Sequence, residues 1–154
     1  MIIQTQKGRI TNPDRQKEYA FISPAVSPCK TRRDSVFNAL LLAENRRIEP
    51  WAATALAYLN HRTWQKEAIP YIRPALEKSE EVQRTGDIFF PTAWIRSLLS
   101  GHQSAEAYLE IEHFFRDHPD FPWMLSNKIR QQANFLYRTN KILHGQQEKR
   151  VRPF

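Results

Sequence analysis

Apolar residues recur at intervals of three and four positions along most of the chain, which is the spacing of a helix with one buried face. The segment that follows Thr31, a plausible N-cap, shows the pattern clearly. Its apolar positions are Val36, Phe37, Leu40 and Leu41. Only residues 84–90 alternate in the manner of a strand, and that stretch is too isolated to form a sheet. The pattern therefore predicts a protein built from helices alone.

Prolines mark where many of these helices begin. Ten prolines and only four glycines divide the chain into segments of helical length. Proline is tolerated in the first turn of a helix, where its missing N–H has no partner to lose. Asn12-Pro13 predicts a helix that runs to about Ile22, and 23–28 is then a turn or a short helical continuation. Further helices are predicted to start at Glu49-Pro50, at Pro91 and at Pro122.

Two prolines in the middle of a segment predict a break. Residues 64–84 contain Pro70 and Pro74, and a proline inside a helix costs about 3 kcal/mol. We therefore expect a short helix that ends at about 70–73 and a second one that opens at Pro74, with Leu76 and Val82 facing inward. Gly86 would end the second helix in the left-handed conformation that glycine adopts readily.

The remaining helices follow from the same reasoning. The helix from Pro91 ends at Gly101, and Ser104 caps a helix that Pro119 stops. The last and longest helix runs from Pro122 to Gly145 at the latest. The expected inward positions of these helices, and of the one that starts at residue 49, are Trp51, Ala55, Tyr58, Leu59, Trp94, Ile95, Leu98, Leu99, Tyr108, Ile111, Phe114, Phe115, Leu125, Ile129, Ala133 and Leu136.

Several antiparallel helices joined by short turns form either a bundle or a superhelical stack of helical pairs. We predict an all-α, antiparallel helical array of the armadillo or HEAT kind. Because the sequence shows no internal repeat, any repetition would be structural only. The length of 154 residues fits one domain, 1–154. Its helical core would span about 12–143, and 144–154 would form a basic tail at a terminus expected to fray.

Composition supports a folded, soluble chain. Hydrophobic residues make up 41% and aromatic residues 12%, far more than in disordered chains. No apolar run approaches the roughly 20 residues that a membrane helix needs, so we expect no membrane partner. The first residues lack a signal-peptide core, and the compartment remains open. A single cysteine, Cys29, excludes an intramolecular disulfide.

The net charge of +7 raises the question of a nucleic-acid partner, which needs basic residues clustered on one face. Here the basic residues fall in separate segments, many of them beside acids. The only dense run is Lys149-Arg150-Val151-Arg152, in the tail. We therefore expect a solvated surface and regard nucleic acid as an unlikely partner.

No pattern of catalytic residues is present in the sequence. His113 and His118 stand on different faces of a helix, and Glu112 beside them resembles only half of a zinc motif. Cys29 has no histidine nearby in the sequence, and no Gly-x-Ser-x-Gly elbow or glycine-rich phosphate loop occurs. The acids Glu77, Glu80 and Glu81 suit a solvated helix face. We predict no catalytic, metal or cofactor site in this chain.

Two segments are unusual for an all-helical domain: 83–91, which sets a charged loop beside two phenylalanines, and the polar turn 101–104. The first has two interpretations. In one it is a corner, in which Asp87 binds turn amides, Arg84 pairs with a neighbouring acid and the aromatic rings fill the core. In the other it is an exposed loop that faces a partner domain or a peptide groove. The candidate residues are Gln83, Arg84, Thr85, Asp87, Phe89, Phe90, His102 and Gln103.

Six blocks of the sequence, taken in order, resemble the C-terminal helical domain of bacterial zinc aminopeptidases of the gluzincin family, to which aminopeptidase N belongs. The resemblance covers about 12–138, and QRTGDIFFP is its most specific block. The blocks are NPDRQKEYAFISPAVSP (12–28), RIEPWAATALAYLNHR (47–62), YIRPALE (71–77), QRTGDIFFP (83–91), GHQSAEA (101–107) and HPDFPWMLSNKIRQQANFLYR (118–138).

The resemblance implies a non-catalytic domain. In that family the HExxH zinc helix and its glutamate ligand lie in a separate upstream domain, and the C-terminal domain is an armadillo-like helical array that closes over the catalytic domain. Nothing in this chain matches the zinc motif, so no catalytic role is transferred to it. The implied partners are the catalytic domain of the same polypeptide and, indirectly, the peptide substrate. The candidate residues above would then face the other domain or the cavity.

An alternative is a free-standing helical-repeat scaffold that binds a protein or a peptide. An open reading frame that continues upstream into HExxH favours the aminopeptidase domain, and a genuine start codon at Met1 without such a neighbour favours the scaffold. A third hypothesis, a nucleic-acid-binding helical domain, predicts binding that weakens steeply with salt.

Overall fold

The described part of the chain is helical throughout. The computed structural model describes the backbone of residues 2–150 and the side chains of residues 5–142, and within this range it contains no strand. The α-helices are α1 (Ile2–Arg9), α2 (Pro13–Ile22), α3 (Lys30–Leu40), α4 (Glu49–Leu59), α5 (Gln65–Glu77), α6 (Ser79–Thr85), α7 (Phe90–Leu99), α8 (Ala105–Asp117), α9 (Trp123–Gln132) and α10 (Asn134–Arg150). Three 3₁₀-helices lie between them: η1 (Ser23–Val26), η2 (Ala43–Arg46) and η3 (Arg62–Trp64). The predicted all-α class is confirmed.

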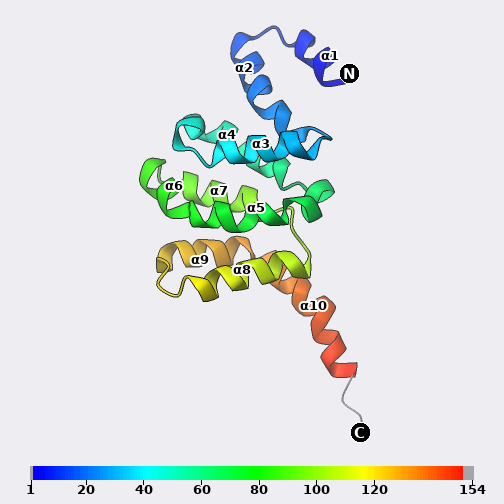
Figure 1. Ribbon diagram of the computed structural model, residues 1–154, viewed down its shortest axis with the longest axis vertical. Coiled ribbons are helices and arrows are strands. Elements are labelled where there is room, and N and C mark those ends of the chain that lie inside the picture. Colours follow the sequence, from blue (N-terminus) through cyan, green and yellow to red (C-terminus); the bar gives the residue numbers. More distant parts are fainter. Residues whose placement is uncertain (1, 151–154) are drawn as a thin grey trace.

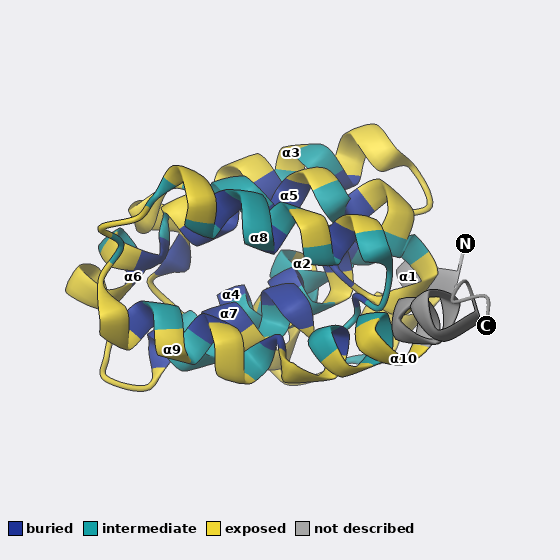
Figure 2. Cartoon of the chain, turned by 90° about the horizontal axis from the view of Figure 1, so that it is seen from below, coloured by how far each residue is buried: buried dark blue, intermediate teal, exposed yellow. Residues whose placement is uncertain are grey.

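The helices stack in pairs along the long axis of the molecule. Figure 1 shows α3 beside α4, then α5 beside α6 and α7, then α8 beside α9, with α2 at one end and α10 at the other. Viewed along the stack (Figure 2), α3, α5 and α8 lie on one side, and α4, α7 and α9 lie on the other. This arrangement is a stack of helical pairs, and its closer likeness to armadillo or HEAT repeats stays a prediction.

The core lies between these two rows of helices. Trp94 of α7 is fully buried, and its indole Nε1 donates a hydrogen bond to the carbonyl oxygen of Ala75 in α5 at 3.0 Å. Phe37 of α3 stacks on Tyr71 of α5 with ring centroids 4.2 Å apart. Leu76 and Val82 are fully buried, as predicted. Buried aromatic rings therefore hold α7 to α5 within one pair and join that pair to α3 of the neighbouring pair.

Side-chain caps fix two of the helix starts where the sequence predicts them. Asn12 Oδ1 accepts hydrogen bonds from the backbone N–H groups of Asp14 and Arg15, at 2.9 and 3.2 Å. Ser104 Oγ accepts one from the N–H of Ala107 at 3.2 Å. The prediction of Thr31 as an N-cap is wrong, because α3 already begins at Lys30 after Cys29. The extended backbone imposed before Pro28 lets the chain enter the helix earlier.

The predicted break at Pro74 is also wrong, because α5 runs through both Pro70 and Pro74. Its buried side chains share one face, and their burial outweighs the loss of two backbone hydrogen bonds. These side chains are Ala68, Tyr71, Ile72, Ala75 and Leu76. The break falls instead at Lys78, between the end of α5 at Glu77 and the start of α6 at Ser79.

Gly86 ends α6 in a different way from the predicted left-handed cap. Its backbone is extended, with φ −99° and ψ 174°. A Cβ at this position would lie 2.6 Å from the Phe90 ring and 2.9 Å from the carbonyl oxygen of Val82. Glycine is therefore required here for close packing and not for its backbone freedom.

The predicted last helix is two helices. The break falls at Ala133, between α9 and α10, and α10 continues past Gly145 to Arg150. The predicted positions Leu125, Ile129 and Leu136 are buried nevertheless. The basic tail lies outside the residues whose side chains are described.

Some predicted inward positions are wrong. The inner face of α4 consists of Ala52, Ala55, Leu56 and Leu59, while Tyr58 is exposed and Trp51 is half-buried. The buried face of α4 is rotated relative to the predicted one, because α4 packs against α3 on one side and against α7 on another. Val36, Leu41, Tyr108 and Phe115 are half-buried against the core.

No helix in the described range combines the length and the apolar character needed to cross a membrane.

Candidate binding groove and apolar end

The corner between α6 and α7 has features of both of its predicted interpretations. Asp87 Oδ1 accepts hydrogen bonds from the N–H groups of Phe89 (2.7 Å) and Phe90 (2.9 Å), which confirms the predicted turn. Phe90 is buried in the core, but Phe89 is 77% exposed. The prediction that Arg84 pairs with an acid is wrong, since the described residues contain no ion pair of Arg84. Gln83 and Thr85 are also exposed.

Phe89 belongs to a group of exposed apolar side chains. The α3–α4 connection, the α6–α7 loop and the α8–α9 loop all lie on the same side of the stack, at the left in Figure 1, where the helices of each pair end. Ile88 is 80% exposed and Trp123, the first residue of α9, is 72% exposed. We name this region the apolar end, and its members are Leu42, Ile48, Ile88, Phe89, Trp123 and Met124.

The second candidate segment, 101–104, lies at the other end of α7. His102 is buried, and its Nε2 lies 2.9 Å from Asn60 Oδ1, while its Nδ1 has no hydrogen-bond partner. Burial lowers the pKa of His102 to about 4. The imidazole is therefore neutral near pH 7 and donates from Nε2 to the amide oxygen. The structure thus separates the two predicted segments, and their interdomain role stays a prediction.

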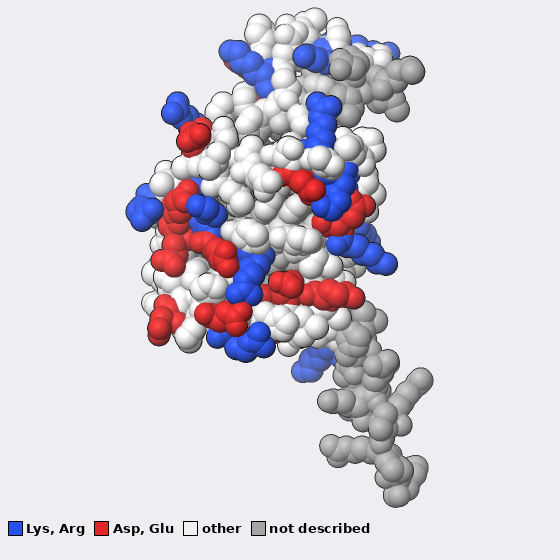
Figure 3. Space-filling view, viewed as in Figure 1, with Lys and Arg blue, Asp and Glu red and all other residues white. Residues whose placement is uncertain are grey.

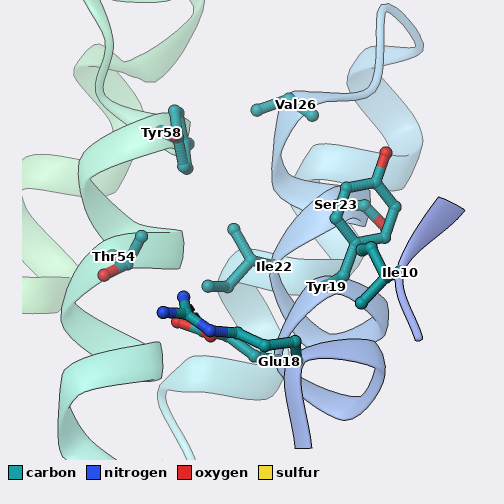
Figure 4. A pocket seen from close by; sticks show the side chains of 9 residues that line it. Ile10, Glu18, Tyr19, Ile22, Ser23, Val26, Thr54 and Tyr58 are labelled. Carbon is teal, nitrogen blue, oxygen red and sulfur yellow. Dashed lines mark hydrogen bonds and ion pairs between the residues drawn. The ribbon is translucent and has the colours of Figure 1, made fainter. Parts of the chain in front are cut away.

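A hollow between α2 and α4 opens on the surface, beside the C-terminal half of α4. Figure 4 shows Ile22 and Val26 on one side and Thr54 and Tyr58 of α4 on the other. Its volume is about 560 Å³. The charged side chains at its margin, Arg15 and Glu18, pair with each other at 3.4 Å. The interior is mainly apolar.

A second hollow, of about 730 Å³, lies between α4 and α7. The two hollows share Thr54 and Tyr58 and therefore adjoin along α4, and we name the two together the α2–α4–α7 groove. The second hollow is lined by Ala53, Thr54, Ala57, Tyr58, His61, Arg62, Ala93, Arg96, Ser97, Ser100, Gly101 and Gln103. None of these residues is acidic.

The groove is the feature that the sequence did not reveal. Of the predicted site residues, Gln103 alone lines it, and its N–H is engaged with Gln65 Oε1 at 3.3 Å. The other lining positions on α4 and α7 are the ones that do not belong to the buried faces of these two helices. The only indication of a groove in the sequence was the small size of some of these residues, such as Ala57 and Ala93.

The predicted absence of catalytic and metal sites is not contradicted. Among the described residues, no three His, Cys, Asp or Glu side chains come close enough to share a metal ion. His118 follows the last residue of α8, with its Nδ1 2.9 Å from the carbonyl oxygen of Phe114. Cys29 is exposed, and a backbone hydrogen bond from Arg32 lowers the pKa of its thiol.

Acidic and basic side chains are interspersed on the face shown in Figure 3. Ion pairs among the described residues include Lys30 with Asp34 at 2.7 Å and Arg73 with Asp117 at 2.7 Å. Exposed pairs of this kind contribute little stability, but they neutralise the surface locally. This face therefore offers no patch of one sign to a nucleic acid.

Comparison with models of protein families finds no match for this chain, and neither does comparison with curated proteins or with solved structures.

Proposed function

We propose that this chain is the non-catalytic C-terminal domain of a zinc-dependent aminopeptidase, docked through its apolar end on the catalytic domain and helping to close and shape the peptide-binding cavity. The zinc ion and the reacting groups belong to the catalytic domain. The present chain supplies a rigid wall of stacked helices. The resemblance of six sequence blocks to this family supplies the identity of the partner.

The apolar end is the observation on which this proposal mainly rests. Isolated soluble proteins rarely leave large apolar side chains grouped together in water, and such a group usually marks an interface. Here three loops far apart in the sequence bring large apolar residues to one side of the stack, with Ile88 and Phe89 among the most exposed. A neighbouring domain that covered them would remove this surface from water.

The corner itself is built to hold these side chains outward. Asp87 locks the loop through two backbone hydrogen bonds, and its own N–H donates to Glu49 Oε1 of α4 at 2.9 Å. Phe90 anchors the loop in the core, while the side chains of Ile88 and Phe89 stay in solvent. A preorganised apolar loop loses little entropy when a partner covers it.

The first test is the coding sequence. An open reading frame that continues upstream into an HExxH helix supports the proposal, and a separate gene without such a neighbour contradicts it. The isolated chain supplied with zinc should not hydrolyse peptides. Turnover that a chelator abolishes would show that the chain has chemistry of its own.

The second test uses the full polypeptide. We expect the double substitution Ile88→Asp and Phe89→Asp to weaken domain docking, because it places two charges in an apolar interface. Limited proteolysis between the domains should accelerate and peptide turnover should fall. The control is Leu109→Asp on α8, an exposed leucine outside the apolar end. Equal effects of the two variants would refute docking through the apolar end.

A free-standing scaffold that binds a peptide is the second candidate function. The α2–α4–α7 groove favours it, because the groove is complete within this one chain. This candidate predicts that the isolated chain is monodisperse and binds a peptide without any other domain.

A further inference from the structure

We propose that the α2–α4–α7 groove binds an acidic peptide segment in an extended conformation. The side-chain carboxylates of the segment would contact Arg62 and Arg96, and an apolar side chain would enter the hollow beside Tyr58. The inference deepens the proposed function, since it names the class of peptide that the cavity wall selects. It holds equally for the free-standing scaffold.

Charge is the first argument. Arg62 and Arg96 are exposed and line the second hollow, in which no acidic residue takes part. Neither forms an ion pair with any described residue, whereas Arg33, Arg46 and Arg73 all pair with acids. A guanidinium group offers five N–H donors in a planar arrangement that matches a carboxylate. Two unpaired guanidinium groups in this acid-free second hollow complement an acidic ligand.

The positions of Arg62 and Arg96 near helix ends leave the N–H donors of their guanidinium groups available. Arg96 lies in the last turn of α7 and Arg62 follows the end of α4. Positive charge is favourable near the C-terminal end of a helix because of the helix dipole. That long-range interaction occupies none of the N–H donors, which remain available to a ligand.

The shape of the second hollow suits an extended backbone. Its floor is made of small side chains, including Ala57, Ala93 and Ser97, which allow a peptide main chain to approach the helices closely. No described residue hydrogen-bonds to the hydroxyl groups of Ser97 and Ser100, so both can serve peptide N–H and C=O groups. Thr54 is different, because its hydroxyl already donates to the carbonyl oxygen of Pro50 at 2.8 Å.

The first hollow suits an apolar side chain. Ile10, Ile22, Val26 and Tyr58 supply its surface, and the only charged side chains, Arg15 and Glu18, neutralise each other at the margin (Figure 4). A ligand that spans both hollows therefore needs apolar and acidic residues in one segment.

Tyr58 and Arg62 set the spacing of these contacts. Tyr58 borders the apolar hollow in the last turn of α4, and Arg62 follows the end of α4 and the extended backbone of His61. An extended peptide advances about 3.3 Å per residue, so an acidic residue about two or three positions from the apolar one is the spacing to probe.

Fluorescence polarisation with labelled synthetic peptides tests the inference. The probe is a ten-residue peptide, acetylated and amidated, with one leucine and two aspartates placed two and three positions away. A second peptide replaces both aspartates by asparagine, and a third keeps the asparagines but has a free C-terminal carboxylate. The protein variants are the double substitution Arg62→Gln/Arg96→Gln and the control Arg84→Gln, an exposed and unpaired arginine outside the groove.

We expect the aspartate peptide to bind the unaltered chain about tenfold or more tightly than the asparagine peptide, since each charge-assisted contact contributes more than a neutral one. The double variant should lose this preference, and Arg84→Gln should retain it. Thermal unfolding of the variants should match that of the unaltered chain, because neither arginine of the groove has a partner to lose.

Four results would overturn the inference. The asparagine peptide could bind as tightly as the aspartate peptide, or no peptide could bind. Preference for the free-carboxylate peptide would show that the groove takes a chain end. Displacement of the probe by a single-stranded oligonucleotide at a lower concentration than the unlabelled peptide would assign the groove to nucleic acid. These outcomes leave docking through the apolar end untouched, because that is measured with the Ile88 and Phe89 variants.

Discussion

Gly101 lies so close to Asn60 that a Cβ on Gly101 would stand 1.8 Å from the carbonyl oxygen of Asn60. The same two segments are joined by the hydrogen bond between His102 Nε2 and Asn60 Oδ1. Asn60 in turn donates from Nδ2 to the carbonyl oxygen of Leu56 at 3.0 Å. The C-terminal ends of α4 and α7 are therefore locked together directly beneath the groove.

The first prediction concerns Gly101→Ala. The added methyl group would meet backbone atoms, which have no rotamer to escape into, so the helix ends must separate. We expect a loss of about 3 kcal/mol of unfolding free energy, which corresponds to a fall in melting temperature of about 6–12 °C for a chain of this size. Calorimetry measures it. The control is Gly8→Ala, because nothing lies within 4 Å of a Cβ at that position. Equal melting temperatures for the two variants would contradict the packing argument.

The second prediction concerns the pH dependence that His102 confers. Burial lowers its pKa from the usual 6.5 to about 4, so between pH 4 and 6.5 the unfolded chain binds a proton that the folded chain does not. Stability therefore rises with pH across this window and falls as the pH drops from 6.5 towards 4. At most about 3 kcal/mol is involved.

His102→Gln provides the comparison for this prediction. Glutamine can donate to Asn60 and does not titrate, while other groups with lowered pKa values, such as Asp34 and Glu81, are common to both proteins. Urea unfolding at pH 7 and pH 4.5 should show a larger loss for the unaltered chain than for the variant. The same loss in both would show that His102 is not the titrating group.

The third prediction concerns Arg33, a buried arginine that joins three segments. Its Nη1 donates to the carbonyl oxygens of Ser27 (2.6 Å) and Pro28 (3.0 Å), its Nη2 pairs with Glu67, and its Cζ lies 4.0 Å from the centre of the Trp64 ring.

Removing the Arg33 side chain leaves the Ser27 carbonyl without this donor and opens space in the core. We expect Arg33→Ala to lower the free energy of unfolding by about 2–3 kcal/mol in chemical unfolding. The cost is no larger because Glu67 is half-exposed and its carboxylate regains water when the arginine is removed. The neighbouring Arg32 is exposed, and Arg32→Ala should change the unfolding free energy by less than about 0.5 kcal/mol. A similar cost for both substitutions would mean that the buried contacts of Arg33 contribute nothing.

The fourth prediction concerns the prolines within α5. Pro70 is exposed and interrupts the hydrogen bonding of a continuous helix. We expect Pro70→Ala to stabilise the chain by about 1–2 kcal/mol, since the helical gain exceeds the greater entropy of the unfolded chain. Pro13→Ala should be neutral or slightly destabilising, because Pro13 stands in the first turn of α2, where proline is favourable. Thermal unfolding compares them, and destabilisation by Pro70→Ala would mean that the proline is needed at that position.

Local chemistry explains which parts of the fold were predictable. Asn12 and Ser104 cap helices through hydrogen bonds that span only two or three residues. The starts of α4 and α7 likewise depend on a nearby proline. Interactions of such short range can be recognised from neighbouring residues in the sequence.

The candidate site was predictable only in part. The sequence singled out the corner at 83–91 but left open whether its aromatic rings fill the core or are exposed, and the structure buries Phe90 and exposes Phe89. The groove was missed, because its residues come from α2, α4 and α7 and are individually unremarkable. Only their juxtaposition produces a depression with two unpaired arginines.

The sequence by itself determined the helical class, most helix starts and the lack of a recognisable catalytic motif, because these follow from proline positions, caps and apolar spacing. The tertiary structure alone decided that α5 continues through Pro74, that Arg33 is buried and that a groove crosses three helices. Each of these depends on contacts between residues distant in the chain, whose combined burial outweighs local preference.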